Sequence, residues 1–107
     1  MSELFNLNGK TALVTGSSRG LGFAFVQALA EHGADVILNG TRVDRLEQAA
    51  QLITDRGFRA DTLAFDVADE HAVVAAFESL DRQNRQVDIL INNAGIQLRK
   101  PLTELAV

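Results

Sequence analysis

The stretch Thr15-Gly16-Ser17-Ser18-Arg19-Gly20-Leu21-Gly22 lies between an apolar run, Thr11–Val14, and a helical pattern. Its first glycine permits a sharp turn out of a strand, and the other two let the backbone approach a ligand because they lack a Cβ. The following helix would point its unpaired N–H groups, and the positive end of its dipole, at a bound anion. The stretch therefore predicts a strand–turn–helix unit that binds nucleotide phosphates; a turn that only lets helix pack closely on strand is the alternative.

Strands and helices are predicted to alternate along the chain. Four β-rich runs recur, at Thr11–Thr15, Val36–Asn39, Thr62–Phe65 and Val87–Asn92. Between them, three segments place their apolar residues on one helical face each: Leu21, Phe25, Ala28 and Leu29; Leu46, Ala49, Ala50 and Ile53; Val73, Ala76, Phe77 and Leu80. Gly33 and Gly57 are expected to close the first two helices, and Asp69 to cap the start of the third. This alternation predicts an α/β fold with a parallel sheet, helices on both faces and right-handed crossovers.

Composition limits the possible partners. The chain has 107 residues, expected to form one domain over residues 1–107, with a net charge of −4 and no cysteine. No basic run favours nucleic acid, no segment reaches the length of a membrane span, and the start of the chain does not resemble a signal peptide. Without thiols a disulfide is impossible and a reducing cytoplasm is expected. The acidic residues show no spacing for metal ligands, so no metal is predicted.

The end of the second predicted strand bears on which dinucleotide binds. An acid there would accept hydrogen bonds from a free ribose 2′-hydroxyl, but this chain has Asn39-Gly40-Thr41-Arg42, with no acid until Asp44. A guanidinium would instead bind a 2′-phosphate, and Arg19 in the glycine turn can approach the same group. These features favour NADP(H) over NAD(H), unless Arg42 is only a solvated residue at the start of the second helix.

The third and fourth strands also end in polar or small residues. Asp66-Val67 follows the third strand, where the aspartate could accept a hydrogen bond from an adenine amine or could simply cap a turn. Asn92-Asn93-Ala94-Gly95 follows the fourth, and its small residues would let an adenosine ribose lie against the backbone. Asn93 has two readings here, as a ligand contact or as a structural link between strand ends.

With these strand ends, the chain resembles the amino-terminal part of the short-chain dehydrogenase/reductase family over nearly all its residues. The resemblance rests on Thr15–Gly22, on Asp66-Val67 and on Asp88–Gly95. Within the family, Asn39-Gly40 and Ile96–Pro101 are most similar to gluconate 5-dehydrogenases, which interconvert gluconate and 5-ketogluconate. A Rossmann-like sheet with strand order 3-2-1-4, incomplete relative to the full family fold, is therefore expected.

The resemblance also implies roles for individual residues. The turn residues Gly16, Ser17, Ser18, Arg19, Gly20, Leu21 and Gly22 would bind the pyrophosphate, with Arg19 also reaching the 2′-phosphate. Arg42 would lie at the 2′-phosphate, Asp66 and Val67 at the adenine, and Asn92, Ala94 and Gly95 at the adenosine ribose. Asn39 and Thr41, after the second strand, would also bind the cofactor. NADP-preferring members often carry arginine directly after the glycine of Asn39-Gly40, where this chain has Thr41.

No catalytic residue is carried over. Family members use a serine, a Tyr-x-x-x-Lys motif and an asparagine further along the fold, and this chain contains no tyrosine. Two hypotheses follow: the cofactor-binding part of an NADP-dependent oxidoreductase, inactive by itself, or a non-catalytic nucleotide-binding or self-associating module. A third class, methyltransferases, is disfavoured because they usually have an acid where Asn39 stands. The fourth strand is expected to form an exposed apolar edge and to mediate homo-oligomers through Ile89–Ile91.

Overall fold

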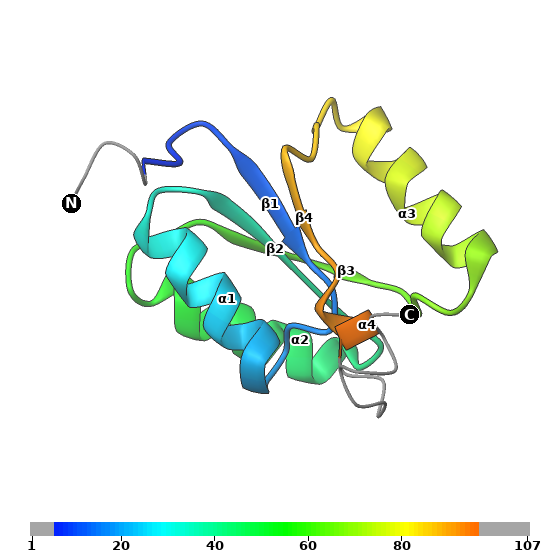
Figure 1. Ribbon diagram of the computed structural model, residues 1–107, viewed down its shortest axis with the longest axis horizontal. Coiled ribbons are helices and arrows are strands. Elements are labelled where there is room, and N and C mark those ends of the chain that lie inside the picture. Colours follow the sequence, from blue (N-terminus) through cyan, green and yellow to red (C-terminus); the bar gives the residue numbers. More distant parts are fainter. Residues whose placement is uncertain (1–5, 97–107) are drawn as a thin grey trace, which may run out of the picture.

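The strands and helices alternate as the sequence predicts. The computed structural model describes residues 6–96, and of Gly95 and Ile96 only the backbone (Figure 1). The elements follow in the order β1 (Thr11–Val14), α1 (Gly20–Glu31), β2 (Asp35–Gly40), α2 (Val43–Thr54), β3 (Ala60–Ala64), α3 (Glu70–Arg82), β4 (Ile89–Ile91) and α4 (Asn93–Ile96).

The sheet has four parallel strands in the order β3-β2-β1-β4, which confirms the predicted order. In the centre of the sheet, Ala12 of β1 pairs with Val36 of β2 on one side and Ile89 of β4 on the other. All four strands run the same way, so their carboxyl ends meet at one edge. That edge is where ligands bind in open sheets of this kind.

Helices cover both faces of the sheet, as predicted, but unequally. Helices α1 and α2 lie together on one face and α3 lies on the other (Figure 1). Because β1 and β2 are covered on both sides, their apolar residues are buried without alternation. The stripe predicted for α2 is confirmed, since its four members are all buried against β1 and β2: Leu46, Ala49, Ala50 and Ile53.

The apolar face predicted for α1 is confirmed for Phe25 and Leu29, which pack against the core, but it is wrong for Leu21 and Ala28. The buried positions are Gly22, Val26 and Ala30, whereas Leu21 is 50% exposed and Ala28 is also exposed. One position turns a helix by about 100°, enough to move a side chain from the core to the rim. A hydrophobic pattern gives glycine no weight, so it cannot show that Gly22 belongs to the buried face of α1.

The strand limits also differ from those expected. β3 begins at Ala60 and ends at Ala64, earlier than the predicted Thr62–Phe65, and β4 is confined to Ile89–Ile91. The limits of β3 follow from its pairing with β2, in which Val36 pairs with Ala60. An apolar pattern does not predict this pairing, because β3 is a half-exposed strand at the edge of the sheet.

The predicted helix ends agree with the structure. Gly33 and Gly57 lie just past α1 and α2 with positive φ angles of 102° and 89°. The Asp69 side chain caps α3 by accepting a hydrogen bond from the Ala72 N–H at 3.2 Å.

Candidate functional site

A hollow of about 270 Å³ lies at the carboxyl ends of β1, β2 and β3. We refer to it as the strand-end hollow. It is lined by residues from the glycine turn, the end of β2, the start of α2, the end of β3 and α4: Gly16, Ser18, Arg19, Asn39, Gly40, Thr41, Arg42, Arg45, Phe65, Asp66, Val67 and Ala94. Three strand ends that are far apart in the sequence thus meet at one concave site.

The glycine turn passes very close to α4. Gly16 adopts a positive φ of 59°, and a Cβ at this position would lie 3.3 Å from both Cα and Cβ of Ala94. A side chain here would be strained by the backbone conformation and crowded by Ala94. The turn therefore needs glycine at residue 16 for both its shape and its packing.

The Asn39 side chain links the glycine turn to the sheet through hydrogen bonds from both its oxygen and its nitrogen. Its Oδ1 accepts a hydrogen bond from the Gly16 N–H at 3.1 Å, and its Nδ2 donates to the carbonyl oxygens of Leu63 and Phe65 at 3.0 Å each. The residue is buried. Asn39 is a predicted cofactor-binding residue and lines the strand-end hollow. The hydrogen bonds at both ends of its amide also link the glycine turn to the end of β3.

Ser17 takes part in the same arrangement. Its backbone N–H donates to the Asn39 carbonyl at 2.8 Å, and its hydroxyl accepts from the Asn39 N–H at 3.0 Å. The side chain is fully buried and does not line the strand-end hollow. Ser17 therefore holds the glycine turn against β2 through hydrogen bonds and does not line the hollow.

The start of α4 is joined to the end of β1. Asn93 Nδ2 donates to the Gly16 carbonyl at 3.0 Å, and the Thr15 hydroxyl donates to Asn92 Oδ1 and accepts from the Ala94 N–H, both at 3.1 Å. Of the two readings of Asn93, the structure shows the structural one for its amino group. Its Oδ1 is buried and has no hydrogen-bond partner among the described residues.

Three arginines line the strand-end hollow. Arg19 precedes α1, Arg42 precedes α2, and Arg45 lies in the first turn of α2. Arg42 Nη2 lies 3.3 Å from Asp44 Oδ2, and this contact together with the backbone N–H of Arg45 lowers the pKa of the Asp44 carboxyl. The sequence prediction missed Arg45; the available signal was its place three residues after Arg42, in the first turn of the helix that follows the second strand.

Asp66 lies at the hollow and also shapes a turn. Its Oδ1 accepts a hydrogen bond from the Ala68 N–H at 2.9 Å, so the capping role considered for it is present. Val67 beside it is exposed, and Phe65 contributes a lining surface that the sequence prediction did not include. This part of the hollow offers an apolar wall with one carboxylate, a combination suited to a flat ring with a polar edge.

Not every predicted site residue reaches the hollow. Those that line it are Gly16, Ser18, Arg19, Asn39, Thr41, Arg42, Asp66, Val67 and Ala94. Those outside its lining are Ser17, Gly20, Leu21, Gly22 and Asn92. Gly95 lies in α4, and the structure describes only its backbone.

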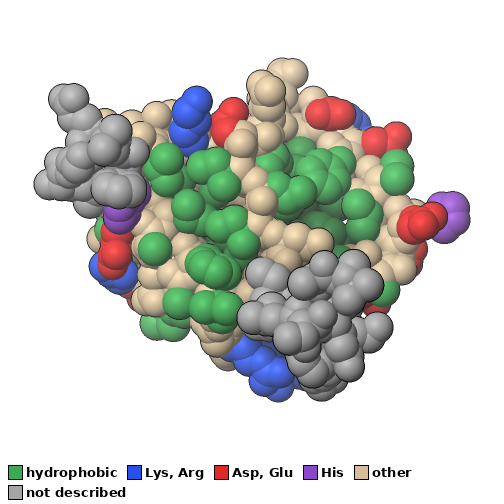
Figure 2. All heavy atoms as spheres, viewed as in Figure 1, with side chains coloured by type: hydrophobic (Ala, Val, Ile, Leu, Met, Phe, Trp, Pro, Cys, Tyr) green, Lys and Arg blue, Asp and Glu red, His purple; other side chains and the backbone are tan. Residues whose placement is uncertain are grey.

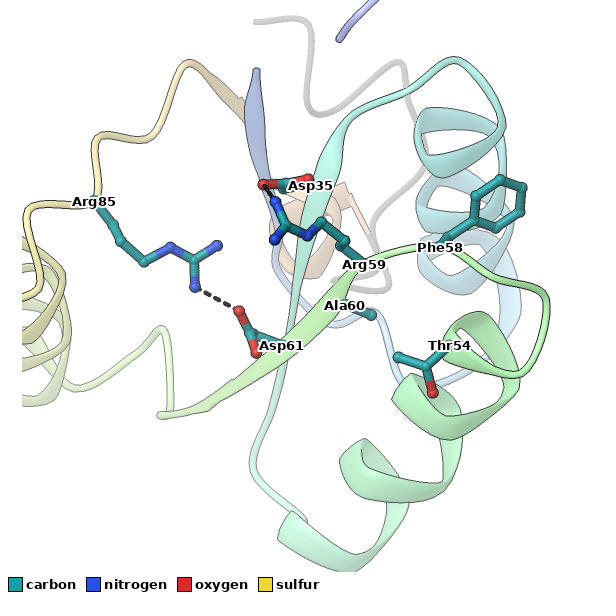
Figure 3. Close-up of a pocket in the computed structure, with 7 residues that line it drawn as sticks. All are labelled: Asp35, Thr54, Phe58, Arg59, Ala60, Asp61 and Arg85. Atoms are coloured by element: carbon teal, nitrogen blue, oxygen red, sulfur yellow. Dashed lines mark hydrogen bonds and ion pairs between the residues drawn. The ribbon is translucent and has the colours of Figure 1, made fainter. Parts of the chain in front are cut away.

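A second, larger hollow of about 590 Å³ lies at the opposite ends of the strands, where β2 and β3 begin (Figure 3). Figure 3 shows Arg59 pointing toward Asp35 and Arg85 pointing toward Asp61. The nitrogen and oxygen atoms of these ion pairs are 3.7 Å and 2.6 Å apart, respectively. Each acid in its lining thus faces an arginine, so this hollow presents no unbalanced charge. The strand-end hollow is lined by three arginines and one acid, Asp66, while Asp44 lies beside Arg42 outside the lining, so this hollow is the better site for an anion.

Residues 6–96 contain no group of three or more histidine, aspartate or glutamate side chains arranged to bind a metal ion. No helix in that part of the chain is both long and apolar enough to cross a membrane.

The chain is similar to known dehydrogenases over nearly its whole length. The family model for short chain dehydrogenase matches residues 10–107. Gluconate 5-dehydrogenase of Gluconobacter oxydans is 45% identical over 97% of this chain and 41% of its own length.

Two solved structures have a similar fold and a comparable sequence identity to this chain. A gluconate 5-dehydrogenase from Burkholderia cenocepacia, in complex with NADP and tartrate, has a TM-score of 0.81 at 42% identity, covering 92% of this chain and 39% of that one. L-sorbose reductase from Gluconobacter frateurii, complexed with NADPH and L-sorbose, has a TM-score of 0.80 at 38% identity, covering 94% and 38%.

The chain spans about two fifths of the length of these relatives, 41% in the case of the Gluconobacter oxydans enzyme. The part that it matches contains the glycine turn and the ends of all four strands. With a family-model match over residues 10–107 and this sheet order, the chain belongs to the short-chain dehydrogenase family.

Proposed function

We propose that this chain is the NADP(H)-binding part of a short-chain dehydrogenase. The observation that carries the proposal is the convergence of Arg19, Arg42 and Arg45 on the strand-end hollow, with no acid directly at the end of β2. A 2′-phosphate needs such guanidinium groups, and a carboxylate in their place would repel it. The NADP and NADPH complexes of the two similar structures support the same choice.

The bound cofactor would lie along the carboxyl ends of the strands. The turn from Gly16 to Gly22 and the start of α1 would face its pyrophosphate. Arg19, Thr41 and Arg42 would lie at the 2′-phosphate, and Asp66 and Val67 at the adenine. The ribose would rest against Asn92, Ala94 and Gly95, while Asn39 positions the turn. Residues 1–107 would thus act as a single dinucleotide-binding domain.

The reaction we propose for the whole protein is hydride transfer between the nicotinamide and a hydroxyl or keto group. Similarity to gluconate 5-dehydrogenase makes gluconate and 5-ketogluconate the first substrates to test. Since the family's general acid/base is a tyrosine and residues 1–107 contain none, we expect these residues alone to bind cofactor without turnover.

Calorimetric titration of the chain with NADPH and NADH tests the proposal. The wild-type chain should bind NADPH more tightly than NADH. Arg42→Asp should lower the affinity for NADPH by about tenfold and change the affinity for NADH by less than about threefold, because only NADPH carries the 2′-phosphate that the new carboxylate repels. Equal losses for both cofactors would remove the argument for preference. If wild type bound neither cofactor, the assignment of the site would fail.

A second candidate function is self-association, and it is favoured by the exposed edge of the sheet. Within residues 6–96, β4 pairs only with β1, and Leu90 is 57% exposed. Leu90 pairs in register with Leu13, so its side chain is on the face that α3 only partly covers. Figure 2 shows hydrophobic side chains gathered across the middle of the view in which Figure 1 shows β4. We propose that two copies pair through β4.

Sedimentation at micromolar concentration should show a dimer for wild type and a monomer for Leu90→Lys, since a charge on the joined face opposes association. Leu52→Lys is the matched control, because Leu52 is equally exposed at 57% but lies on α2. A folded wild-type monomer, or equal effects of the two substitutions, would contradict pairing through β4.

A further inference from the structure

The three guanidinium groups at the strand-end hollow are not equivalent. Arg42 forms an ion pair with Asp44 at 3.3 Å. Within residues 6–96, neither Arg19 nor Arg45 forms an ion pair. A phosphate that enters the hollow would therefore find two arginines available and one already bound to a carboxylate.

Asp44 occupies the position of an anion at the start of α2. Its carboxylate accepts a hydrogen bond from the Arg42 guanidinium at 3.3 Å, and this contact is the main cause of the lowered pKa of Asp44. Arg42 is the N-cap residue of α2 and provides no side-chain cap of its own. Both a guanidinium and the positive end of a helix, which attract phosphate, are thus partly neutralised by Asp44.

Arg45 supplies a positive charge near the end of β2. Thr41 stands directly after Gly40 and carries no charge, so the guanidinium groups on this side of the hollow come from Arg42 and Arg45. Arg45 is four residues beyond Thr41 and three beyond Arg42, and all three line the same hollow. A long, freely rotating guanidinium from the first turn of α2 can approach a phosphate held at the end of β2.

We propose that Arg45 is the principal guanidinium for the 2′-phosphate and that Asp44 weakens the grip on that phosphate by competing for Arg42. This inference rests on the proposed NADP(H) function and assigns the discrimination to two neighbouring residues of α2. Arg45 raises the preference for a phosphorylated ribose, and Asp44 lowers it. Neither residue would affect the binding of the rest of the adenosine group.

Two small probes isolate this discrimination: adenosine 2′,5′-bisphosphate and adenosine 5′-monophosphate, which differ only in the 2′-phosphate. In calorimetric titrations of the 107-residue chain, Arg45→Gln should lower the affinity for the bisphosphate by about tenfold and change the affinity for the monophosphate by less than about twofold. Asp44→Asn should raise the affinity for the bisphosphate by about threefold. Circular dichroism of each variant checks that it is folded.

Arg82→Gln is the matched control, because it removes the same charge from an exposed position on α3. It should change the bisphosphate affinity by less than about twofold. A double-mutant cycle adds a second test: Arg42→Gln should cost more affinity in the Asp44→Asn background than in wild type, since Arg42 is then released for the phosphate.

The inference is overturned if Arg45→Gln weakens the bisphosphate no more than Arg82→Gln does, or if Asp44→Asn weakens it. Those results together with a wild-type preference for NADPH would leave the proposed function standing. Failure of wild type to bind NADPH and NADH would instead reject the proposed function itself.

Discussion

Replacing Asn39 with aspartate is expected to destabilise the chain by about 4 kcal/mol at neutral pH. Asn39 Nδ2 donates to the carbonyl oxygens of Leu63 and Phe65, both at 3.0 Å, in a buried site. A carboxylate cannot donate, so two carbonyl oxygens would lose their partner and face a negative charge away from water. A loss of this size is a large share of the stability of a small domain, and urea denaturation would measure it.

The same substitution should make stability depend on pH. Burial beside carbonyl oxygens raises the pKa of the introduced carboxyl in the folded chain above its unfolded value. The folded state then binds more protons, so the penalty is smallest at low pH and grows as pH rises through the folded pKa. Unfolding should therefore be easier at about pH 8 than at about pH 5, beyond any change that wild type shows.

Asn6→Asp is the matched control for this charge change. Asn6 is exposed, and its Oδ1 only accepts from the Asn8 N–H at 2.9 Å, which a carboxylate can also do. We expect its stability within about 0.5 kcal/mol of wild type. If Asn39→Asp were no more destabilising than Asn6→Asp, the hydrogen bonds of Asn39 would not secure the turn.

Gly22→Ala is the second substitution with a large expected effect, a loss of about 3 kcal/mol. An added Cβ would overlap the Gly16 carbonyl oxygen, and would lie 2.6 Å from Asn93 Nδ2 and 2.8 Å from Ser17 Cα. Two of these atoms are backbone, so no change of rotamer relieves the contact. The clash outweighs the gain of about 1 kcal/mol that alanine brings to a helix interior. The free energy of unfolding in urea measures the result.

Gly20→Ala separates this overlap from backbone strain. Gly20 has a positive φ of 61°, but a Cβ there meets nothing within 4 Å. Its cost should be only about 1–2 kcal/mol, the ordinary penalty of a left-handed conformation. Equal losses at residues 20 and 22 would show that close packing of α1 on the turn is not what requires glycine at residue 22.

The pattern of the sequence determined most of the fold. Apolar runs separated by amphipathic segments specified alternating strands and helices, because burial on both faces requires continuous apolar strands. Chemistry at the strand ends carried further information. The glycine turn and Asp66 pointed to the edge where the hollow lies, since parallel strands place their carboxyl ends together.

Other features depended on contacts between distant residues. Nothing in the sequence around Asn39 shows that its amide bonds to residues 16, 63 and 65, since these partners come together only when three strands align. The same applies to Gly22, whose lack of a side chain matters only because the turn passes over it.

Local periodicity and turn chemistry were thus enough to predict the order of elements, the family and the strand ends that carry the site. Only the folded chain shows which predicted residues line the strand-end hollow and which are buried beneath it. It also shows that Arg45 lines the hollow with Arg42 and Arg19, and that Arg42 forms an ion pair with Asp44. Burial and hydrogen-bond partners depend on which residues folding brings together, so a local sequence pattern does not record them.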